Sequence, residues 1–414
     1  MSTAALRKGW CPTLLSPMES GDGWLARVKP SAAKFDTNQA RVIADAARRY
    51  ANGHINLTSR GNLQIRGLSP RSAEQFAEII ISHGLAGEHA SIESIRNVMA
   101  NPLGADDSTA SFDSHALAAE IEAMLAAELA LEALPPKFGI LVDGGGVLPL
   151  SDVSSDINVR AFEGRLAIQL DGGTHAVVCS PVVAAKIVMS LALAFLHLSW
   201  ERRELPHRMR ELVLSLGEAT VFTAAGVAAA AALLTERPEA RAPIGFICGR
   251  DTGFFGAGLP FGRIDAETLA SLADLSERFG DGSLRTTPWR ALVFVGVAPS
   301  DADGLSHQIS DLGLITDPAD PRLLIHACVG RGACPNASVD TRRDASRFAT
   351  ASPGLTVHIS GCAKGCAHQG PASVTLVGNN GCYDLVRDGS AGDAPVITGL
   401  SFDQALVAIE QEAP

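Results

Sequence analysis

Positive charge is scarce in this sequence. The 414 residues include 34 Lys and Arg against 45 Asp and Glu, which gives a formal net charge of −11 at pH 7. A surface with this balance repels nucleic acids and anionic membranes, so we expect neither to be a main partner. A site for an anionic ligand therefore has to be local.

Long apolar runs are also lacking. The most apolar stretch, IVMSLALAFLHLSW at 187–200, runs for fourteen residues between Lys186 and Glu201. About 20 apolar residues are needed to cross a bilayer, so this stretch is expected to be a buried helix. The opening MSTAALRKGWCPTLL has no long apolar segment with a cleavage site. We therefore expect no secretory signal, a cytoplasmic location and reduced cysteines.

What the sequence does contain is repetition. The segment from Phe35, FDTNQARVIADAARRYANGHINLTSRGNLQIRGL, aligns without a gap with the segment from Ile264, IDAETLASLADLSERFGDGSLRTTPWRALVFVGV. Each copy predicts an amphipathic helix, a glycine stop, alternating strand residues and a further helix, which is the pattern of a ferredoxin-like half. A second ungapped pair relates the segment from Gly139 to the segment from Thr356. Two repeats in the same order predict a duplicated, pseudo-twofold molecule with a ligand at its junction.

The repeats predict an α+β fold with two ferredoxin-like halves and two α/β units, because a chain of this length is expected to form more than one core. The predicted parts are a first ferredoxin-like half (1–90), a first α/β unit (91–178), a helical insert that completes it (179–245), a second ferredoxin-like half (246–320) and a second α/β unit with the clustered cysteines (321–414).

Four of the eight cysteines form two pairs in glycine-rich stretches, ACVGRGAC with Cys328 and Cys334, and GCAKGC with Cys362 and Cys366. Thiolates that converge from such loops suit zinc or an iron–sulfur cluster, because the glycines let backbone N–H groups approach the sulfur atoms. Structural zinc usually has two to four residues between its paired cysteines, whereas gaps of five and three favour a 4Fe-4S cluster. Zinc and buried free thiols remain as alternatives. The other four cysteines are expected to be core thiols.

A polar face accompanies the first repeat. From His54 to Arg66 the odd positions Ile55, Leu57, Leu63 and Ile65 are apolar and the even positions, which include Arg60, Gln64 and Arg66, are polar, as in one half-buried strand. This face could simply be solvated. The second copy has lost it, since Trp289, Ala291 and Val293 replace Arg60, Asn62 and Gln64. Arg96 and Lys137 are two further candidates for an anion site.

These motifs in order, LTSRGNLQ, RNVMANP, LPPKF, C-x5-C and C-x3-C, resemble those of the nitrite and sulfite reductase family, whose members couple a 4Fe-4S cluster to sirohaem. The resemblance covers nearly the whole chain and implies that family's duplicated fold. It implies that Arg60, Arg96 and Lys137 surround a catalytic pocket, and that Cys328, Cys334, Cys362 and Cys366 hold the cluster, with Cys366 at the bridging position. One departure is Gly139, where the reductases have a second pocket lysine.

The amino-terminal stretch RKGWCPTLLSPMESGDGWLARVKP at 7–30 is similar to that of the oxygen-dependent members of this superfamily in aerobic cobalamin synthesis. That likeness implies a monooxygenase that takes precorrin-3A and dioxygen, receives electrons from an NADH-dependent reductase and contains a mononuclear non-haem iron besides the cluster. The candidate groups for the carboxylates of the substrate are Arg60, Gln64, Arg66, Arg96, Lys137 and Lys364.

Two other functions remain open, a sirohaem-dependent nitrite or sulfite reductase and a non-catalytic iron–sulfur electron carrier or redox sensor. No ligand pattern for a second iron is visible. His326, His358 and His368 lie near the cysteines in sequence, and we expect structural roles for them. No general acid or base stands out.

Overall fold

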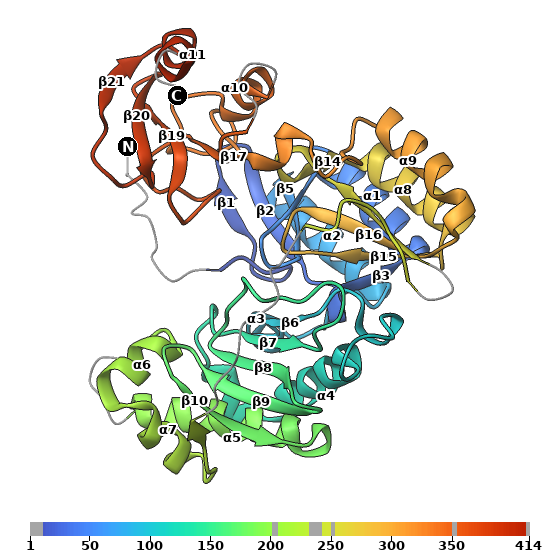
Figure 1. The fold of residues 1–414 in the computed structure, drawn as a ribbon, viewed down its shortest axis with the longest axis vertical. Helices are drawn as coiled ribbons and strands as arrows, with labels where there is room; N and C mark the ends of the chain where they lie inside the picture. Colours follow the sequence, from blue (N-terminus) through green and yellow to red (C-terminus); the bar gives the residue numbers. More distant parts are fainter. Residues whose placement is uncertain (1–10, 201–205, 232–241, 250–252, 350–353, 411–414) are drawn as a thin grey trace.

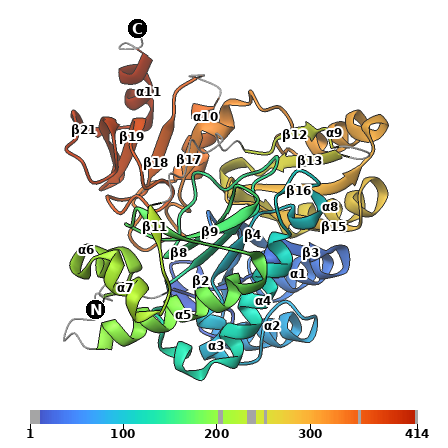
Figure 2. The same ribbon diagram turned by 60° about the horizontal axis from the view of Figure 1, so that its bottom comes forward.

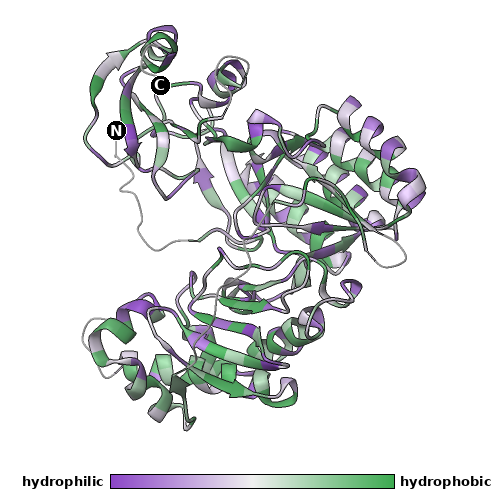
Figure 3. Cartoon of the chain, in the orientation of Figure 1, coloured by the Kyte–Doolittle hydropathy of each residue, from purple (hydrophilic) through white to green (hydrophobic). Residues whose placement is uncertain are grey.

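A computed structural model describes residues 11–200, 206–231, 242–249, 253–349 and 354–410. Parts of two predicted segments, residues 7–10 of the amino-terminal motif and residues 201–205 and 232–241 of the helical insert, lie outside the described residues. The chain forms four sheets, and Figure 1 shows helices packed on them. Figure 3 shows apolar residues along many of the strands and both apolar and polar residues along the helices.

The first ferredoxin-like half is an antiparallel sheet covered by two helices. Its strands are β1 (Met18–Ser20), β2 (Gly23–Val28), β4 (His54–Leu57) and β5 (Leu63–Leu68), and its helices are α1 (Thr37–Tyr50) and α2 (Pro70–Ser82), with the short helix η1 (Ser31–Ala33) after β2. Odd-numbered residues such as Ile55 and Ile65 face these helices, because strand side chains alternate between faces. The even-numbered side chains therefore lie on the opposite face.

The second half has the same plan. Its strands are β12 (Gly245–Ile247), β13 (Gly253–Gly258), β15 (Ser283–Thr286) and β16 (Ala291–Val297), and its helices are α8 (Ala266–Phe279), α9 (Ala302–Asp311), η4 (Pro260–Gly262) and η5 (Pro299–Asp301). Helices α1 and α8 lie at the same place in the aligned repeats and pack against each other in one shared core. The predicted duplication is confirmed.

Each half gives one strand to the other half. β3 (Lys34–Asp36) pairs with β15 of the second half, where Phe35 lies opposite Leu284, and β14 (Arg263–Asp265) pairs with β4 of the first half, where Ile264 lies opposite Ile55. Figure 1 shows β3 in blue beside β15 in gold. The two sheets therefore have the orders β1-β2-β5-β4-β14 and β12-β13-β16-β15-β3.

The first α/β unit is a mixed sheet of order β11-β10-β9-β8-β7-β6. Its elements are α3 (Ala90–Ile95), β6 (Val98–Ala100), η2 (Gly104–Asp106), α4 (Ser114–Ala127), η3 (Leu129–Ala133), β7 (Ile140–Asp143), β8 (Ile157–Phe162), β9 (Arg165–Leu170), β10 (His175–Cys179), α5 (Pro181–Trp200), α6 (Met209–Leu216), α7 (Glu218–Ala224) and β11 (Ala230–Ala231). β6, β7 and β8 are parallel and the rest are antiparallel. Figure 2 shows α4 and α5 lying on this sheet.

The second α/β unit repeats this plan in a sheet of order β17-β18-β19-β20-β21. Its elements are η6 (Pro321–Leu324), β17 (Ile325–Ala327), α10 (Thr341–Phe348), β18 (Val357–Ser360), β19 (Ala372–Asn379), β20 (Cys382–Gly389), β21 (Ile397–Leu400) and α11 (Phe402–Glu410). β17, β18 and β19 are parallel, as are β6, β7 and β8 in the first unit. α11 follows the sheet as α5 does, and after this helix the first unit continues with α6, α7 and β11.

Two details of the sequence analysis are corrected. The stretch from His54 to Arg66 is a hairpin of two strands, because the chain reverses where Thr58 N–H donates to Asn62 O at 2.9 Å and Gly61 takes a left-handed φ of 70°. The apolar helix α5 is longer than the apolar run from which it was expected, since Lys186 lies on its exposed face.

α5 is the one helix in the described part of the chain that is long and apolar enough to cross a membrane by length and composition. Of its most apolar window, 56% is buried inside the protein. Its side chains pack with those of α4 and β9 in the core of the first α/β unit. This packing accounts for the apolar composition of the helix.

Candidate functional site

The turn of the β4–β5 hairpin holds Arg60 at the junction of the repeats. The hydroxyl of Thr58 accepts hydrogen bonds from the backbone N–H groups of Arg60 at 3.3 Å and Asn62 at 3.1 Å. A Cβ at Gly61 would lie 3.1 Å from Oγ1 of Thr286 in the second half. The turn is therefore fixed by its own hydrogen bonds and by close contact with the other ferredoxin-like half.

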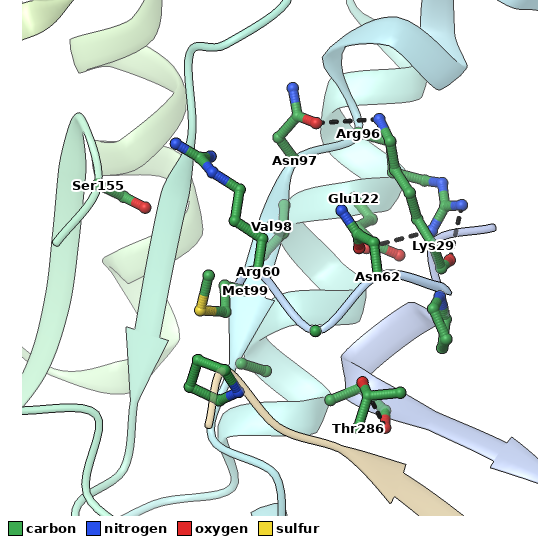
Figure 4. A pocket seen from close by; sticks show the side chains of 15 residues that line it. Lys29, Arg60, Asn62, Arg96, Asn97, Val98, Met99, Glu122, Ser155 and Thr286 are labelled. Carbon is green, nitrogen blue, oxygen red and sulfur yellow. Dashed lines mark hydrogen bonds and ion pairs between the residues drawn. The ribbon is translucent and has the colours of Figure 1, made fainter. Parts of the chain in front are cut away.

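Beside this turn lies a pocket shared by both halves and the first α/β unit (Figure 4). The residues that line it are Lys29, Pro30, Ala33, Arg60, Gly61, Asn62, Arg96, Asn97, Val98, Met99, Ala100, Glu122, Ser155, Thr286 and Pro288. The structure thus brings Arg60 and Arg96 to one pocket, although 35 residues separate them in the sequence. Lys137 is exposed and is not among the lining residues.

A buried network surrounds one wall of the pocket. Nζ of Lys29 donates to the backbone O of Glu93 at 2.6 Å and to Oδ1 of Asn97 at 2.9 Å. Arg96 is paired with Glu93 at 2.9 Å and with Glu122 at 3.6 Å. Burial lowers the pKa of Lys29 to about 8, against the opposing charge of Glu93, and burial raises the pKa of Glu122. Both groups can therefore exchange protons nearer neutral pH than usual.

Arg60 differs from Arg96 because its guanidinium has no hydrogen bond or ion pair with any residue that the structure describes. Burial lowers the pKa of Arg60, and the neighbouring charge of Arg208 adds to this effect, but an arginine stays protonated. In Figure 4 the guanidinium lies beside Ser155, apart from Lys29 and Arg96. Arg60 is thus a cation that an anionic ligand can pair with, whereas two carboxylates already neutralise Arg96.

Gly139 lies directly against this guanidinium. A Cβ at Gly139 would be 3.0 Å from Nη1 of Arg60 and 3.3 Å from Oγ of Ser155. The backbone N–H of Gly139 donates to the fully buried carboxylate of Asp156 at 2.9 Å, which fixes the position of the main chain here. Arg60 therefore occupies space that any side chain at this position would take.

The other predicted carboxylate partners lie outside the pocket. Gln64 accepts a hydrogen bond from Nε of Arg27 at 3.4 Å. Arg66 is buried and paired with Asp22 at 2.8 Å. Lys364 is exposed in the loop between Cys362 and Cys366. The roles predicted for these three residues stay predictions.

The four paired cysteines lie in two loops that leave neighbouring parallel strands. Cys328 follows β17 and Cys362 follows β18, so both loops start at the same edge of the sheet. The backbone N–H of Gly361 donates to Sγ of Cys328 at 3.2 Å. Burial raises the pKa of Cys366, Lys364 opposes this, and the thiols of the other three cysteines raise it further. All four thiols are therefore close enough to interact electrostatically.

These loops offer four thiols and a backbone N–H donor to sulfur, which are groups that a 4Fe-4S cluster would use. A Cβ at Gly361 would lie 2.5 Å from Cβ of Ala337, so close packing against Ala337 favours glycine at this position beside Cys328. Among the residues described, no group of three or more His, Cys, Asp or Glu side chains, the four cysteines included, is arranged to hold a metal ion. A cubane cluster places each thiolate on a different iron, so it needs four thiols around a larger volume and N–H donors to sulfur.

Three histidines pack beneath the loops. The rings of His326 and His368 stack at 4.3 Å, and His358 meets His368 edge-on at 5.8 Å. Burial lowers the pKa of His326 to about 3 and that of His358 to about 4, and the charge of Arg290 lowers both further. The rings of His326 and His358 are therefore uncharged at neutral pH.

The sequence analysis missed Lys29, Glu93, Asn97 and Glu122. Lys29 directly follows the strand β2, whose residues are buried or half-buried, and a lysine in such a place indicates a buried polar site. Glu93 stands three positions before Arg96, a spacing at which helical side chains meet. Nothing local in the sequence identifies Glu122, which reaches the pocket from α4.

Comparison with known proteins agrees with this architecture. The family model of the nitrite/sulfite reductase ferredoxin-like half domain matches residues 16–83 and 249–311. These ranges contain the described strands and helices of the two halves except β12, which ends two residues before the second range. The solved structure of the NirA protein of Mycobacterium tuberculosis superposes with a TM-score of 0.76 at 18% identity, over 94% of this chain and 79% of that chain. The predicted fold of this family is therefore confirmed.

Two sequence relatives cover nearly the whole chain. The ferredoxin–nitrite reductase of Synechococcus elongatus is 24% identical over 90% of this chain and 79% of its own length. The precorrin-3B synthase of a Sinorhizobium species is 32% identical over 95% of this chain and 86% of its own length. The chain therefore belongs to the nitrite/sulfite reductase family and has a precorrin-3B synthase among its relatives.

Proposed function

We propose that this protein is a monooxygenase that converts precorrin-3A to precorrin-3B in aerobic cobalamin biosynthesis. In this reaction dioxygen supplies one oxygen atom to the macrocycle as a hydroxyl group, a γ-lactone closes, and the second oxygen atom leaves as water. An NADH-dependent reductase supplies the two electrons. The observation that carries the proposal is the 32% identity to a precorrin-3B synthase along 95% of the chain.

The pocket offers suitable groups for such a substrate. Arg60 has no partner among the described residues, and Lys29 lines the same pocket with a third N–H that neither Glu93 nor Asn97 accepts. Both can pair with carboxylates of the macrocycle. Arg96, held by Glu93 and Glu122, shapes the wall between them. In this proposal Arg60 and Lys29 bind and orient the tetrapyrrole, Arg96 supports them as part of the pocket wall, and the pocket role expected for Lys137 stays a prediction.

Proton transfer is assigned to two groups of the pocket wall. Lys29 has a pKa of about 8, and burial raises the pKa of Glu122, so each can hold a proton that the reduction of dioxygen consumes. The 4Fe-4S cluster that Cys328, Cys334, Cys362 and Cys366 would hold supplies single-electron transfer from the reductase. No described group of side chains is assigned to a mononuclear iron.

The test is an incubation of the purified protein with precorrin-3A, 18O-labelled dioxygen, NADH and a reductase. We expect one labelled oxygen atom in the product and a visible spectrum of an iron–sulfur protein without sirohaem bands. Tightly bound sirohaem together with fast reduction of nitrite or sulfite would instead establish the reductase function. Absence of any saturable tetrapyrrole binding would favour an electron carrier and refute the proposal.

A further inference from the structure

The two cysteine loops are each held by an arginine from a different ferredoxin-like half. Nη2 of Arg66, from β5, donates to the backbone O of Ala333 at 2.5 Å. Nη2 of Arg290, from the turn before β16, donates to the backbone O of Ala367 at 2.6 Å. Ala333 directly precedes Cys334 and Ala367 directly follows Cys366. Each guanidinium therefore lies one residue from a predicted cluster ligand.

A nearby carboxylate balances the positive charge of Arg66, whereas no described carboxylate balances that of Arg290. Arg66 forms a bidentate ion pair with Asp22, with contacts of 2.8 and 3.0 Å, so its charge is neutralised locally. Arg290 has no carboxylate partner among the described residues, and Ala367 is the one acceptor found for it. A full positive charge therefore remains beside the second loop.

The backbone at Arg290 gives an independent sign that its side chain is needed. Arg290 has a φ of 57°, and its counterpart in the first repeat is Gly61, which has a φ of 70°. A non-glycine residue in this region is strained relative to glycine, because its Cβ crowds the neighbouring carbonyl. The second half thus has an arginine where the fold itself favours glycine. Gly262 makes room for it, since a Cβ there would lie 3.0 Å from Cδ of Arg290.

We propose that Arg290 is a positioning residue that raises the reduction potential of the cluster by placing an uncompensated positive charge against the Cys362–Cys366 loop. The inference rests on the proposed function, because it needs the cluster. One-electron reduction adds a negative charge to the cluster, and a nearby cation in a water-poor site favours that state. Arg66 holds the other loop in place without a comparable effect on the potential.

The test is an anaerobic redox titration of the cluster-loaded protein, followed by visible absorbance and electron paramagnetic resonance, with iron and sulfide measured in each sample. Arg290→Gly removes the charge and relieves the backbone strain, so we expect a more negative midpoint potential without loss of thermal stability. Arg290→Lys keeps the charge and should stay near the wild-type potential. A purely structural role predicts loss of stability in Arg290→Gly and an unchanged potential.

The matched control is the double variant Arg66→Met with Asp22→Asn, which removes the other loop contact without changing the net charge. We expect a near wild-type potential and a reduced cluster content. If Arg290→Gly also lost its cluster, the midpoint potential would be measured in Arg290→Gln instead. The amide of that glutamine keeps a donor for the backbone O of Ala367. A wild-type potential in the uncharged Arg290 variant overturns the inference. A wild-type protein without iron and sulfide overturns the proposed function and this inference together.

Discussion

Substitution of Gly139 tests whether the guanidinium of Arg60 keeps its position only because Gly139 has no side chain. In Gly139→Ala the new Cβ would lie 3.0 Å from Nη1 of Arg60 and 3.3 Å from Oγ of Ser155. Gly139 has no left-handed φ, so backbone strain does not contribute. Overpacking costs about 1–3 kcal/mol, and the end of an arginine can move, so we expect about 1 kcal/mol. That corresponds to a loss of roughly fivefold in tetrapyrrole affinity.

Gly139→Lys adds a charge to the same contact. Two unit charges about 4 Å apart repel each other by about 4 kcal/mol at an effective dielectric constant of 20, so one of the two cations has to move away. Carboxylates of the macrocycle offset part of this repulsion. We expect oxygenation of precorrin-3A to fall by about tenfold or more, and we expect no useful reduction of sulfite or nitrite in return.

The assay is a binding titration with precorrin-3A under anaerobic conditions, followed by a single turnover with dioxygen. The control is a double-mutant cycle with Arg60→Ala. If Gly139→Ala acts by displacing Arg60, its effect disappears once Arg60 has been truncated. Additive effects of the two substitutions, or a Gly139→Lys variant with wild-type oxygenation, would refute the reasoning.

Three further predictions concern the cluster, the pH dependence and the reaction. Alanine at any one of Cys328, Cys334, Cys362 and Cys366 should remove most of the iron and sulfide, and full retention in two of these variants would show that the ligand assignment is wrong. Because the ammonium of Lys29 loses its proton above a pKa of about 8, tetrapyrrole affinity should fall by about tenfold as pH rises from 7 to 9 in the wild type. If the tetrapyrrole affinity of Lys29→Met fell by the same factor over this pH range, Lys29 would not be the group whose deprotonation weakens binding. With an artificial electron donor the wild type should reduce sulfite and nitrite negligibly, and robust six-electron reduction would overturn the proposed function.

The duplication was predictable because it leaves a trace along the sequence. The ungapped alignment of Phe35 with Ile264 places β3 on β14, α1 on α8 and β4 on β15 with equal lengths. The exchange of β3 and β14 was not predictable. A strand pairs in the same way with either copy of a repeated partner, so nothing in its own residues says which copy it joins.

The site was predictable only where a motif defined it. The motif residues Arg60 and Arg96 do line one pocket. The guanidinium of Arg60 is available to a ligand and that of Arg96 is not. This difference depends on Glu122, which pairs with Arg96 and which α4 brings from a distant part of the chain. The lowered pKa of Lys29 depends on burial by three units of the fold, and burial is a property of packing that residue spacing does not encode.

The strand exchange also limits how this chain can fold during its synthesis. β4 ends at Leu57, and β14, its partner at the edge of the first sheet, begins only at Arg263. At 5–20 residues per second the ribosome needs roughly 10–40 s to make the residues between them. During that interval the edge of β4 has no partner from its own chain and could pair with another molecule. We expect the isolated segment 11–90 to aggregate, whereas co-expression with a segment that contains β14 should keep it soluble.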